Sequence, residues 1–448
     1  MHKETLTKLI LYILIPIQLL IFTFLVPPFQ KPDERTHFEQ SLIISKGYLS
    51  CTKKSNNTIP IEKKYIDFIK TPYLDLLTHG RGKLPVSIFL DDLFSNKQDN
   101  NKINFNIDHL CSFPIVSYLP QAFALTVASI SKLNPIMSLY FGRLFMGILG
   151  YFWFLYLYKR ISKNYKLILL FTFALPMTLH QISSFSYDTV HIMFGLTFFV
   201  LIVSFPRKRE SSQKLHYFKL FLILLLFLAS KKIGYETFFL FLFLIPFEIK
   251  PMIISSLIFI PFYFLSKLNG SFDLQNSLTN QIINPISQLN FLFSNPINII
   301  KVVTITTIHR FSFYLQSLIG IFGWLEYGLD PLSYLLYGLF FIYLLTDSNF
   351  MKKQILLKNK IIFLFFTLII SYIFIVLLAY VFNTVPGTLT AHGVQGRYFI
   401  SFLPFIILFF IQFKNKIRLK LQINIFFYYL IILYLAGATF YSVFNRYY

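Results

Sequence analysis

The sequence predicts an all-α, polytopic membrane protein. Apolar residues make up 55% of the 448 residues and charged residues only 13%, a balance far from that of soluble globular proteins. The 41 basic residues fall into short clusters between long apolar runs. Phe (56 copies) and Tyr (28 copies) are unusually frequent, as expected for lipid-facing Phe and interfacial Tyr.

A bilayer core of about 30 Å requires about 20 apolar helical residues, and fewer where neighbouring helices bury the ends. This criterion predicts about eleven transmembrane helices in a single integral membrane domain over 1–448. The first span has a basic start like a signal peptide, but its long apolar run lacks a small-x-small cleavage site, so we expect an uncleaved helix. The predicted spans lie near 7–26, 137–158, 165–180, 187–205, 215–230, 236–249, 252–267, 332–346, 360–382, 398–413 and 421–442.

The basic clusters predict the orientation. Clusters at 159–166, 207–214, 352–360 and 414–420 recur in phase with alternating spans, as the positive-inside rule requires of cytoplasmic loops. We therefore expect a plasma (inner) membrane protein with a cytoplasmic N-terminus and an extracytoplasmic C-terminus. The net charge of +22 does not indicate nucleic-acid binding, because no soluble basic domain is present. The larger loops, 27–136, 268–331 and 383–397, would all lie outside.

Two features of the first outer loop, 27–136, need separate treatment. The stretch 113–131 is apolar enough to span, but Pro114, Pro120 and the downstream charge phase favour a helix lying at the outer interface. The chain's two cysteines, Cys51 and Cys111, also fall in this loop. A bridge between them would stabilise it by about 4 kcal/mol, whereas unpaired thiols remain an alternative because sequence gives no distance.

The first candidate for chemistry is PPFQKPDERTHFEQ, residues 27–40. Its prolines stiffen the approach to Asp33 and Glu34, and His37 would share a helix face with Asp33. The alternative is a solvated acidic pair. A carboxylate fixed there could accept a proton from a hydroxyl nucleophile while a leaving group departs. A divalent cation bound by Asp33 or Glu34 together with a donor phosphate is a further possibility. The sequence contains no Cys/His spacing of the kind that binds a structural metal.

A departing phosphate would need cations on the same face. Arg397 can bind phosphate through a bidentate fork, whereas Lys231 and Lys232 would act as point charges. Interfacial snorkelling of the lysines and helix-end anchoring by the arginine are the alternatives. Asp188 is expected at the outer end of a span, where an ionisable group is functional or paired, or caps the helix.

These segments resemble a known family. PPFQKPDERTHF resembles the Pro-Asp-Glu-x-x-His-Phe signature of a family of bacterial predicted membrane proteins, and GVQGRYFISFLP (393–404) resembles a second motif. The likeness continues in order through YLPQAFAL, LYFGRLF, LPMTLHQISSFSYD, SKKIGYETFFLFLFLIP and GIFGWLE. That family is itself similar to the glycosyltransferase C superfamily. Members of the superfamily use polyprenyl-phosphate sugars and an acidic base in the first outer loop.

The resemblance implies a glycosyltransferase-C-like fold and an inverting transfer from a polyprenyl-phosphate sugar to a glycan or lipid-linked acceptor outside the cell. Asp33 would be the base, Glu34 and His37 would orient the reactants, and Arg397 with Lys231 or Lys232 would hold the phosphate. Competing interpretations are a transporter or flippase, which predicts mid-membrane polar residues and internal pseudo-symmetry, and a polymerase or ligase of surface polysaccharide. Further substrate-side candidates are Lys231, Lys232, Gln395, Tyr398, Asp188, Arg143 and Glu326. We expect Asp33, Arg397 and Lys231 or Lys232 to lie together.

Overall fold

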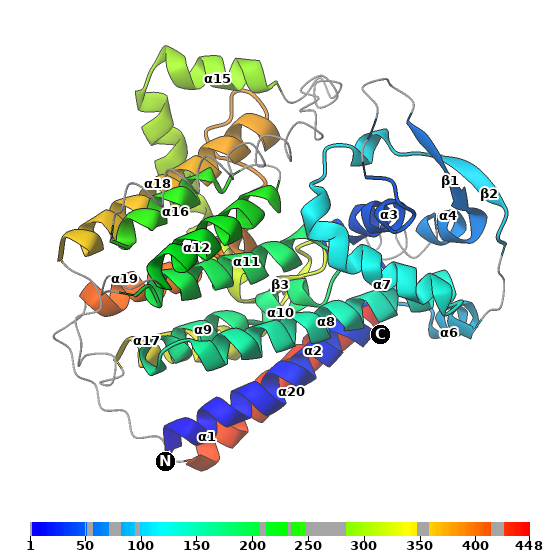
Figure 1. The fold of residues 1–448 in the computed structure, drawn as a ribbon, viewed down its shortest axis with the longest axis horizontal. Coiled ribbons are helices and arrows are strands. Elements are labelled where there is room, and N and C mark those ends of the chain that lie inside the picture. Colours follow the sequence, from blue (N-terminus) through cyan, green and yellow to red (C-terminus); the bar gives the residue numbers. More distant parts are fainter. Residues whose placement is uncertain are drawn as a thin grey trace.

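A computed structural model describes ten stretches of the chain and is mostly helical (Figure 1). The predicted span 252–267 and the candidate Lys232 lie outside these stretches. The described residues are 2–49, 51, 57–70, 82–94, 99–206, 212–231, 234–246, 284–346, 358–413 and 425–448.

Apolar helices lying side by side form the larger part of the molecule. The first span combines α1 (His2–Leu9), a π-helical turn (Ile10–Leu14) and α2 (Ile15–Phe24). The others are α8 (Pro135–Arg160), α11 (Tyr187–Val203), α12 (Ser212–Ala229), α17 (Pro331–Thr346), α18 (Lys358–Asn383), α19 (Leu403–Phe413) and α20 (Ile425–Tyr447). Within the described stretches, three helices are long and apolar enough to cross a membrane, or up to five if each bent pair is one span. Several apolar spans are therefore present, whereas the predicted count of eleven is not reached on this criterion.

Besides the first span, three predicted spans differ from continuous α-helices within their described residues. The span 165–180 follows a 3₁₀ turn (Lys163–Tyr165) and is broken into α9 (Lys166–Phe173) and α10 (Pro176–Ile182), at a 73° bend. Pro176 cannot donate to the preceding turn and restricts the residue before it, so the helix stops there. The span 236–249 contains the 3₁₀ helix η5 (Glu236–Leu244), and 398–413 becomes η7 (Gly396–Phe399) followed by α19.

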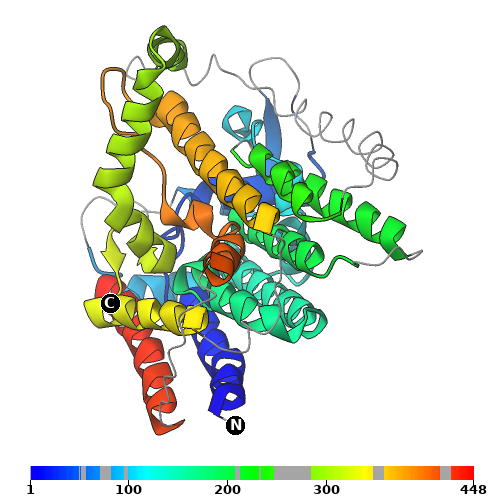
Figure 2. The same ribbon diagram turned by 90° about the vertical axis from the view of Figure 1, so that its left-hand side faces the viewer.

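The expected loop 268–331 contains long helices, which corrects the prediction. Within its described part, α15 (Pro285–Ser294) and α16 (Ile297–Gly320) meet at 112°. Figures 1 and 2 show α16 crossing the direction of the other long helices. Its apolar side chains alternate with Lys301, His309 and Arg310, so no uninterrupted apolar run marked it. A two-stranded sheet of β3 (Ile321–Phe322) and β4 (Tyr327–Gly328) follows.

The first large loop folds around a small core of its own. Phe29, Phe38, Tyr65 and Leu110 belong to this buried cluster. Its elements are α3 (Glu34–Ser45), β1 (Thr58–Glu62), α4 (Lys63–Ile69), α6 (Val86–Phe94), β2 (Lys102–Asn106), η2 (Asp108–Leu110), η3 (Ile115–Tyr118) and α7 (Leu119–Ile130). β1 and β2 pair antiparallel with Thr58 opposite Asn106, so the all-α prediction needs correction for two small sheets.

Two expectations for this loop can be compared with the structure. α7 has 12 residues, and a helix of roughly 18 Å is shorter than a bilayer core, so it does not form a single span. It packs instead between α3 and α8. A disulfide joins Cys51 to Cys111 with their Cα atoms 5.7 Å apart, closing a separation of 60 residues.

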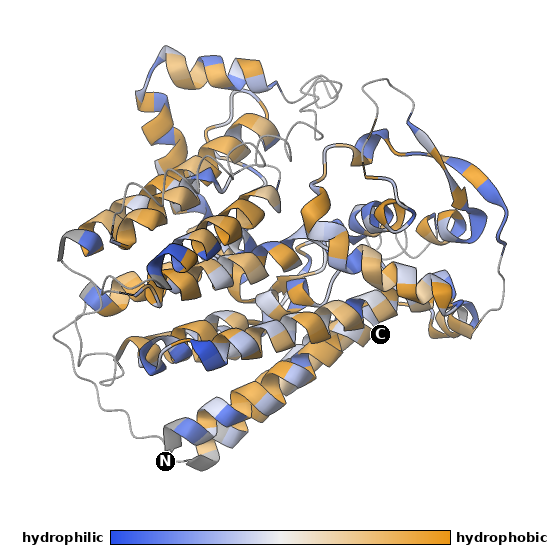
Figure 3. Ribbon diagram, viewed as in Figure 1, coloured by the Kyte–Doolittle hydropathy of each residue, from blue (hydrophilic) through white to orange (hydrophobic). Residues whose placement is uncertain are grey.

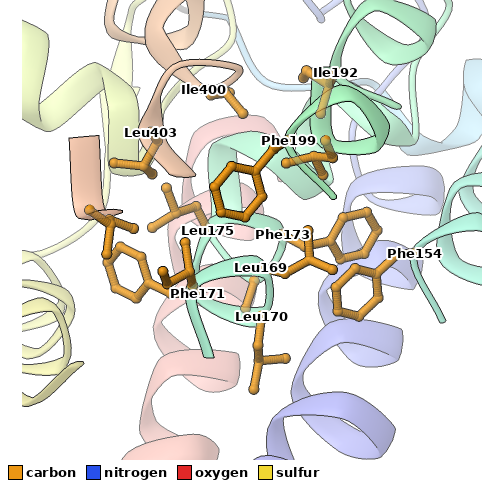
Figure 4. Packing of buried hydrophobic residues seen from close by; sticks show 14 of the residues in the cluster. Phe154, Leu169, Leu170, Phe171, Phe173, Leu175, Ile192, Phe199, Ile400 and Leu403 are labelled. Carbon is orange, nitrogen blue, oxygen red and sulfur yellow. The ribbon is translucent and has the colours of Figure 1, made fainter. Parts of the chain in front are cut away.

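The helical part is held together by interlocking aromatic and aliphatic side chains. The Phe154 and Phe173 rings stack with centroids 4.1 Å apart, and Leu169, Phe199 and Leu403 lie in the same cluster (Figure 4). Figure 3 shows apolar residues along the helices and polar residues gathered at their ends and over α3, β1 and β2.

The two chain ends lie at opposite ends of the helical part. α20 runs parallel to α1 and α2, and Gln18 Nε2 donates to Thr439 Oγ1 at 2.8 Å. The C-terminal end of α8 and the N-terminal ends of α18 and α20 lie on the side of the chain's N-terminus, whereas α3, β1 and β2 lie on the other (Figure 1). We call the latter side the site end.

Candidate functional site

Four charged residues from distant parts of the chain meet at the site end. Asp33 immediately precedes α3, Asp188 lies in the first turn of α11, Lys231 follows α12, and Arg397 lies in η7. Each therefore stands at the end of a helix, where the backbone turns and a side chain can face its neighbours. The expectation that Asp33, Arg397 and Lys231 lie together agrees with this placement, while their catalytic roles stay predictions.

The four charges form a row of alternating sign, which we call the ionic row. Lys231 Nζ is 2.8 Å from Asp188 Oδ1, and Asp188 Oδ2 is 3.8 Å from Arg397 Nε. Arg397 Nη2 is 3.7 Å from Asp33 Oδ2. The first three side chains are 7–8% exposed, whereas that of Asp33 is 53% exposed. The row thus leads from the buried interior to a carboxylate that solvent or a substrate can reach.

Arg397 has unused hydrogen-bonding capacity. Its two carboxylate contacts exceed normal hydrogen-bond length, and within the described part of the chain its buried Nε has no hydrogen-bond partner. A guanidinium carries five donors in a planar fork that fits a phosphate or carboxylate. Burying such a group without partners is costly, so the arrangement fits an anion that arrives later.

Lys231 is enclosed by aromatic rings. Its Nζ lies 5.2, 4.7 and 4.5 Å from the ring centroids of Tyr187, Tyr235 and Tyr398, and it donates to the Tyr235 hydroxyl at 3.0 Å. Burial alone would lower the pKa of Lys231, but Asp188 and these rings raise it above its ordinary value, so the ammonium stays charged. The Lys231 ammonium is therefore already paired with Asp188 and surrounded by the rings, which leaves it little room to bind a phosphate.

The pKa values of two neighbours agree with this picture. Burial opposes the charge on Arg397, but Tyr398, Asp188 and Asp33 together raise its pKa above the ordinary value. Burial raises the pKa of Tyr235 to about 12, so its hydroxyl keeps its proton and donates to the carbonyl of Tyr398 at 3.0 Å. Both cations of the ionic row remain charged over the physiological pH range.

Asp33 occupies an unusual backbone conformation. Its φ of 57° lies in the left-handed region, which residues other than glycine seldom adopt and in which Asp is among the better tolerated. Such strain persists only where the surroundings impose it, and it concentrates at functional sites. Asp33 stands just before α3 rather than within it, and the amide of His37 donates to its carbonyl at 3.1 Å.

Glu34 and Arg143 form a second, buried ion pair. Both side chains are fully buried, and Arg143 Nε donates to Glu34 Oε1 at 2.8 Å while Nη2 pairs with Oε2. Arg143 also donates to the carbonyl of Pro27 at 3.0 Å. The expected role of Glu34 in orienting the reactants and the substrate-side role of Arg143 stay predictions, while this geometry indicates a structural pair that ties α3 to α8.

His37 lies behind the aromatic side chains that surround Lys231. Its Nδ1 is 2.7 Å from the buried hydroxyl of Tyr118, and its ring meets that of Tyr187 edge-on at 4.8 Å. Since the Tyr187 ring also contacts Lys231, His37 supports the aromatic enclosure from behind.

The remaining candidates divide between two places. Gln395 and Tyr398 flank Arg397, and the buried Oε1 of Gln395 has no hydrogen-bond partner among the described residues. Glu326 lies elsewhere, between β3 and β4, where Arg446 Nε donates to its Oε2 at 2.8 Å. The described residues contain no group of three or more His, Cys, Asp or Glu side chains that could hold a metal ion.

Comparison with known proteins places the chain in a family. A family described as "Predicted membrane protein (DUF2142)" matches residues 17–406, most of the chain. The chain belongs to this family. No curated protein and no solved structure matches it. The expected resemblance is confirmed at the level of a predicted membrane protein family, and the relation to glycosyltransferases stays a prediction. The DUF2142 match contains the whole ionic row but not Arg446.

The sequence did not predict several residues that build this candidate site. Tyr187 directly precedes the predicted residue Asp188, and Tyr235 follows the predicted residue Lys231 by four positions. Lys31 lies inside PPFQKPDERTHFEQ but was not singled out. Each of these residues lies within four positions of a charged candidate. That closeness indicates a role in the site only once the burial and contacts of the side chain are known.

Proposed function

We propose that the protein is a membrane glycosyltransferase that moves a sugar from a polyprenyl-phosphate donor to a glycan or lipid-linked acceptor, with inversion. The observation that carries the proposal is Arg397, a buried guanidinium whose Nε has no hydrogen-bond partner among the described residues, beside the half-exposed carboxylate of Asp33. A phosphate-binding fork next to a general base is what a single displacement at a sugar phosphate requires. The expected glycosyltransferase-C-like relationship is part of this proposal.

The reaction would proceed in one step. The acceptor oxygen forms a bond to the anomeric carbon and passes its proton to Asp33, while the bond from that carbon to the phosphate oxygen breaks. The departing lipid phosphate takes the electron pair and gains a negative charge. Arg397 stabilises this charge, and protonation of Asp33 removes the competing carboxylate at the same moment. No second nucleophilic carboxylate is needed.

Asp188 and Lys231 have supporting roles in this proposal. Asp188 lies between Lys231 and Arg397, so it balances one cation and orients the other. The phosphate would contact Arg397, with Gln395 and Tyr398 beside it. We further propose that the site end faces outward from the plasma membrane, because the helix ends next to the basic clusters lie at the opposite end.

The direct test is transfer by the purified protein in lipid nanodiscs. The donors are a panel of radiolabelled sugars linked to polyprenyl monophosphate or diphosphate, and the acceptor is a membrane lipid and glycan extract. Asp33→Asn should lower the rate of transfer about 10²- to 10⁴-fold, because it removes the base. Arg397→Met should also lower the rate, because it removes phosphate stabilisation.

Asp91→Asn is the matched control, because Asp91 is an exposed carboxylate on α6 of the same loop. It should leave the rate unchanged. Full activity of the Asp33→Asn variant would refute the proposed mechanism. Transfer from diphosphate-linked donors alone would favour the polymerase or ligase interpretation.

A further inference from the structure

A buried lysine two residues before Asp33 connects the two chain segments that carry the carboxylates of the ionic row. Lys31 is 1% exposed and reaches the C-terminal end of α10. Its Nζ donates to the carbonyl of Ser183, to Ser183 Oγ at 3.1 Å and to the carbonyl of His180 at 3.4 Å. Carbonyls at a helix C-terminus lack partners within the helix and carry partial negative charge, so an N–H donor is stabilising there.

The turn that Lys31 holds leads directly to Asp188. Ser183 ends α10, and three residues later Ser186 caps α11, its Oγ accepting the amide N–H of Asp188 at 3.0 Å. Lys31 therefore connects the loop that carries Asp33 to the turn that carries Asp188. Arg397 lies between the two carboxylates at 3.7 and 3.8 Å. The Lys31 contacts thus hold the loop of Asp33 and the turn of Asp188 at the separation that allows Arg397 to contact both carboxylates.

The geometry points to Lys31 as a positioning residue that holds Asp33 against Arg397. The inference rests on the proposed role of Asp33 and Arg397. The hydrogen bonds of the Lys31 amine go to Ser183 and His180 and not to Asp33 or Arg397, so Lys31 acts through the backbone of residues 31–33. The left-handed backbone of Asp33 is the local result, because the next residue, Glu34, is anchored separately by Arg143.

The state of the Lys31 amine agrees with a positioning role. Burial, with a contribution from Arg143, lowers the pKa of Lys31 well below its ordinary value, while Glu34 opposes the shift. An amine that is easily neutralised is poorly suited to binding a phosphate, yet it still donates hydrogen bonds to carbonyls.

A cysteine reporter tests the inference without any substrate. The chain's two cysteines are joined in a disulfide, so Asp33→Cys introduces a single free thiol. Arg397 should lower the pKa of this thiol and speed its alkylation by N-ethylmaleimide near pH 7. Adding Lys31→Met should slow alkylation roughly three- to tenfold, because the thiol moves away from the guanidinium. Arg397→Met should slow it similarly, and the two effects should not add.

Two further variants sharpen the experiment. Lys46→Met removes a lysine from the other end of α3, where it pairs with Glu62 at 2.6 Å, and should leave the alkylation profile unchanged. Ser183→Ala removes only the hydroxyl partner of Lys31 and should slow alkylation by a smaller factor. This variant keeps the inference testable if Lys31→Met fails to fold. An unchanged alkylation profile in both Lys31→Met and Ser183→Ala would overturn the inference.

Transfer kinetics separate this inference from the proposed function. With the Asp33 carboxylate in place, Lys31→Met should lower kcat about 10²-fold, because a misplacement of about 1 Å at a reacting group has that effect. The KM for the donor should change far less, since Arg397 keeps its Asp188 contact. A thiol shift in a protein that transfers no sugar would support the positioning role and refute the transferase.

Discussion

Gly396 shows how one residue without a side chain can decide where a functional group stands. A Cβ at this position would lie 2.1 Å from the carbonyl oxygen of Tyr314 and 2.2 Å from the amide nitrogen of Leu318. The Gly396 amide donates to Ser317 Oγ at 2.8 Å, so η7 lies directly on the backbone of α16. The glycine before Arg397 in GVQGRYF is therefore explained by close packing, and not by a positive φ.

Gly396→Ala is expected to damage the site through the backbone. Neither contacting atom belongs to a flexible side chain, so η7 must move away from α16 and take Arg397 with it. We expect about 1–3 kcal/mol of destabilisation and loss of most transfer activity. Thermal unfolding in detergent and the transfer assay measure the two effects. Gly437→Ala in α20, where nothing lies within 4 Å of an added Cβ, should be neutral or stabilising. Equal behaviour of the two variants would contradict this account.

At the scale of elements, the connection between α2 and α3 is held by buried charges. Arg143 of α8 donates to the carbonyls of Thr23, Val26 and Pro27 at the end of α2, and to Glu34 at the start of α3. One guanidinium thus ties both ends of the connection to a third helix. The prolines noted in the sequence restrict this connection, but the buried pair sets its position.

Arg143→Met should destabilise the protein by about 3–5 kcal/mol, because it leaves the carboxylate of Glu34 buried without its partner. Arg143→Met combined with Glu34→Gln should recover part of that loss. Arg35→Met is the control, since Arg35 is 38% exposed and pairs with Glu39 within the same helix, where such pairs contribute about 0.3–0.5 kcal/mol. Chemical unfolding in detergent measures all three. A double variant less stable than Arg143→Met would argue against a mutual pair.

At the scale of the whole molecule, the parallel first and last helices place the termini at opposite ends. The C-terminal end of α8 and the N-terminal ends of α18 and α20 lie on one side, and the loop that carries Asp33 lies on the other (Figure 1). This arrangement agrees with the predicted charge phase. It also brings four helix ends, from α3, α11, α12 and η7, to one place although they are far apart in the sequence.

Accessibility labelling can establish which end faces outward. Asn104→Cys in β2 and Lys163→Cys after α8 place exposed thiols at opposite ends. A membrane-impermeant maleimide should label the Asn104→Cys variant in intact cells, and the Lys163→Cys variant only after permeabilisation. The native disulfide leaves no competing thiol. The reverse pattern would place the proposed site in the cytoplasm and exclude an outward-facing transferase.

The sequence by itself determined the helical membrane class, the family and the candidates Asp33, Asp188, Lys231 and Arg397, because composition, charge phase and short motifs are local properties. Several features depended on the tertiary structure. The break at Pro176, the crossing of α16, the Glu34–Arg143 pair and the Lys31 contacts all depend on what each residue packs against. The two adjacent acids differ in burial: Asp33 is half-exposed beside Arg397, whereas Glu34 is buried with Arg143. A linear pattern contains no distances, so only the folded chain could distinguish a candidate base from a structural ion pair.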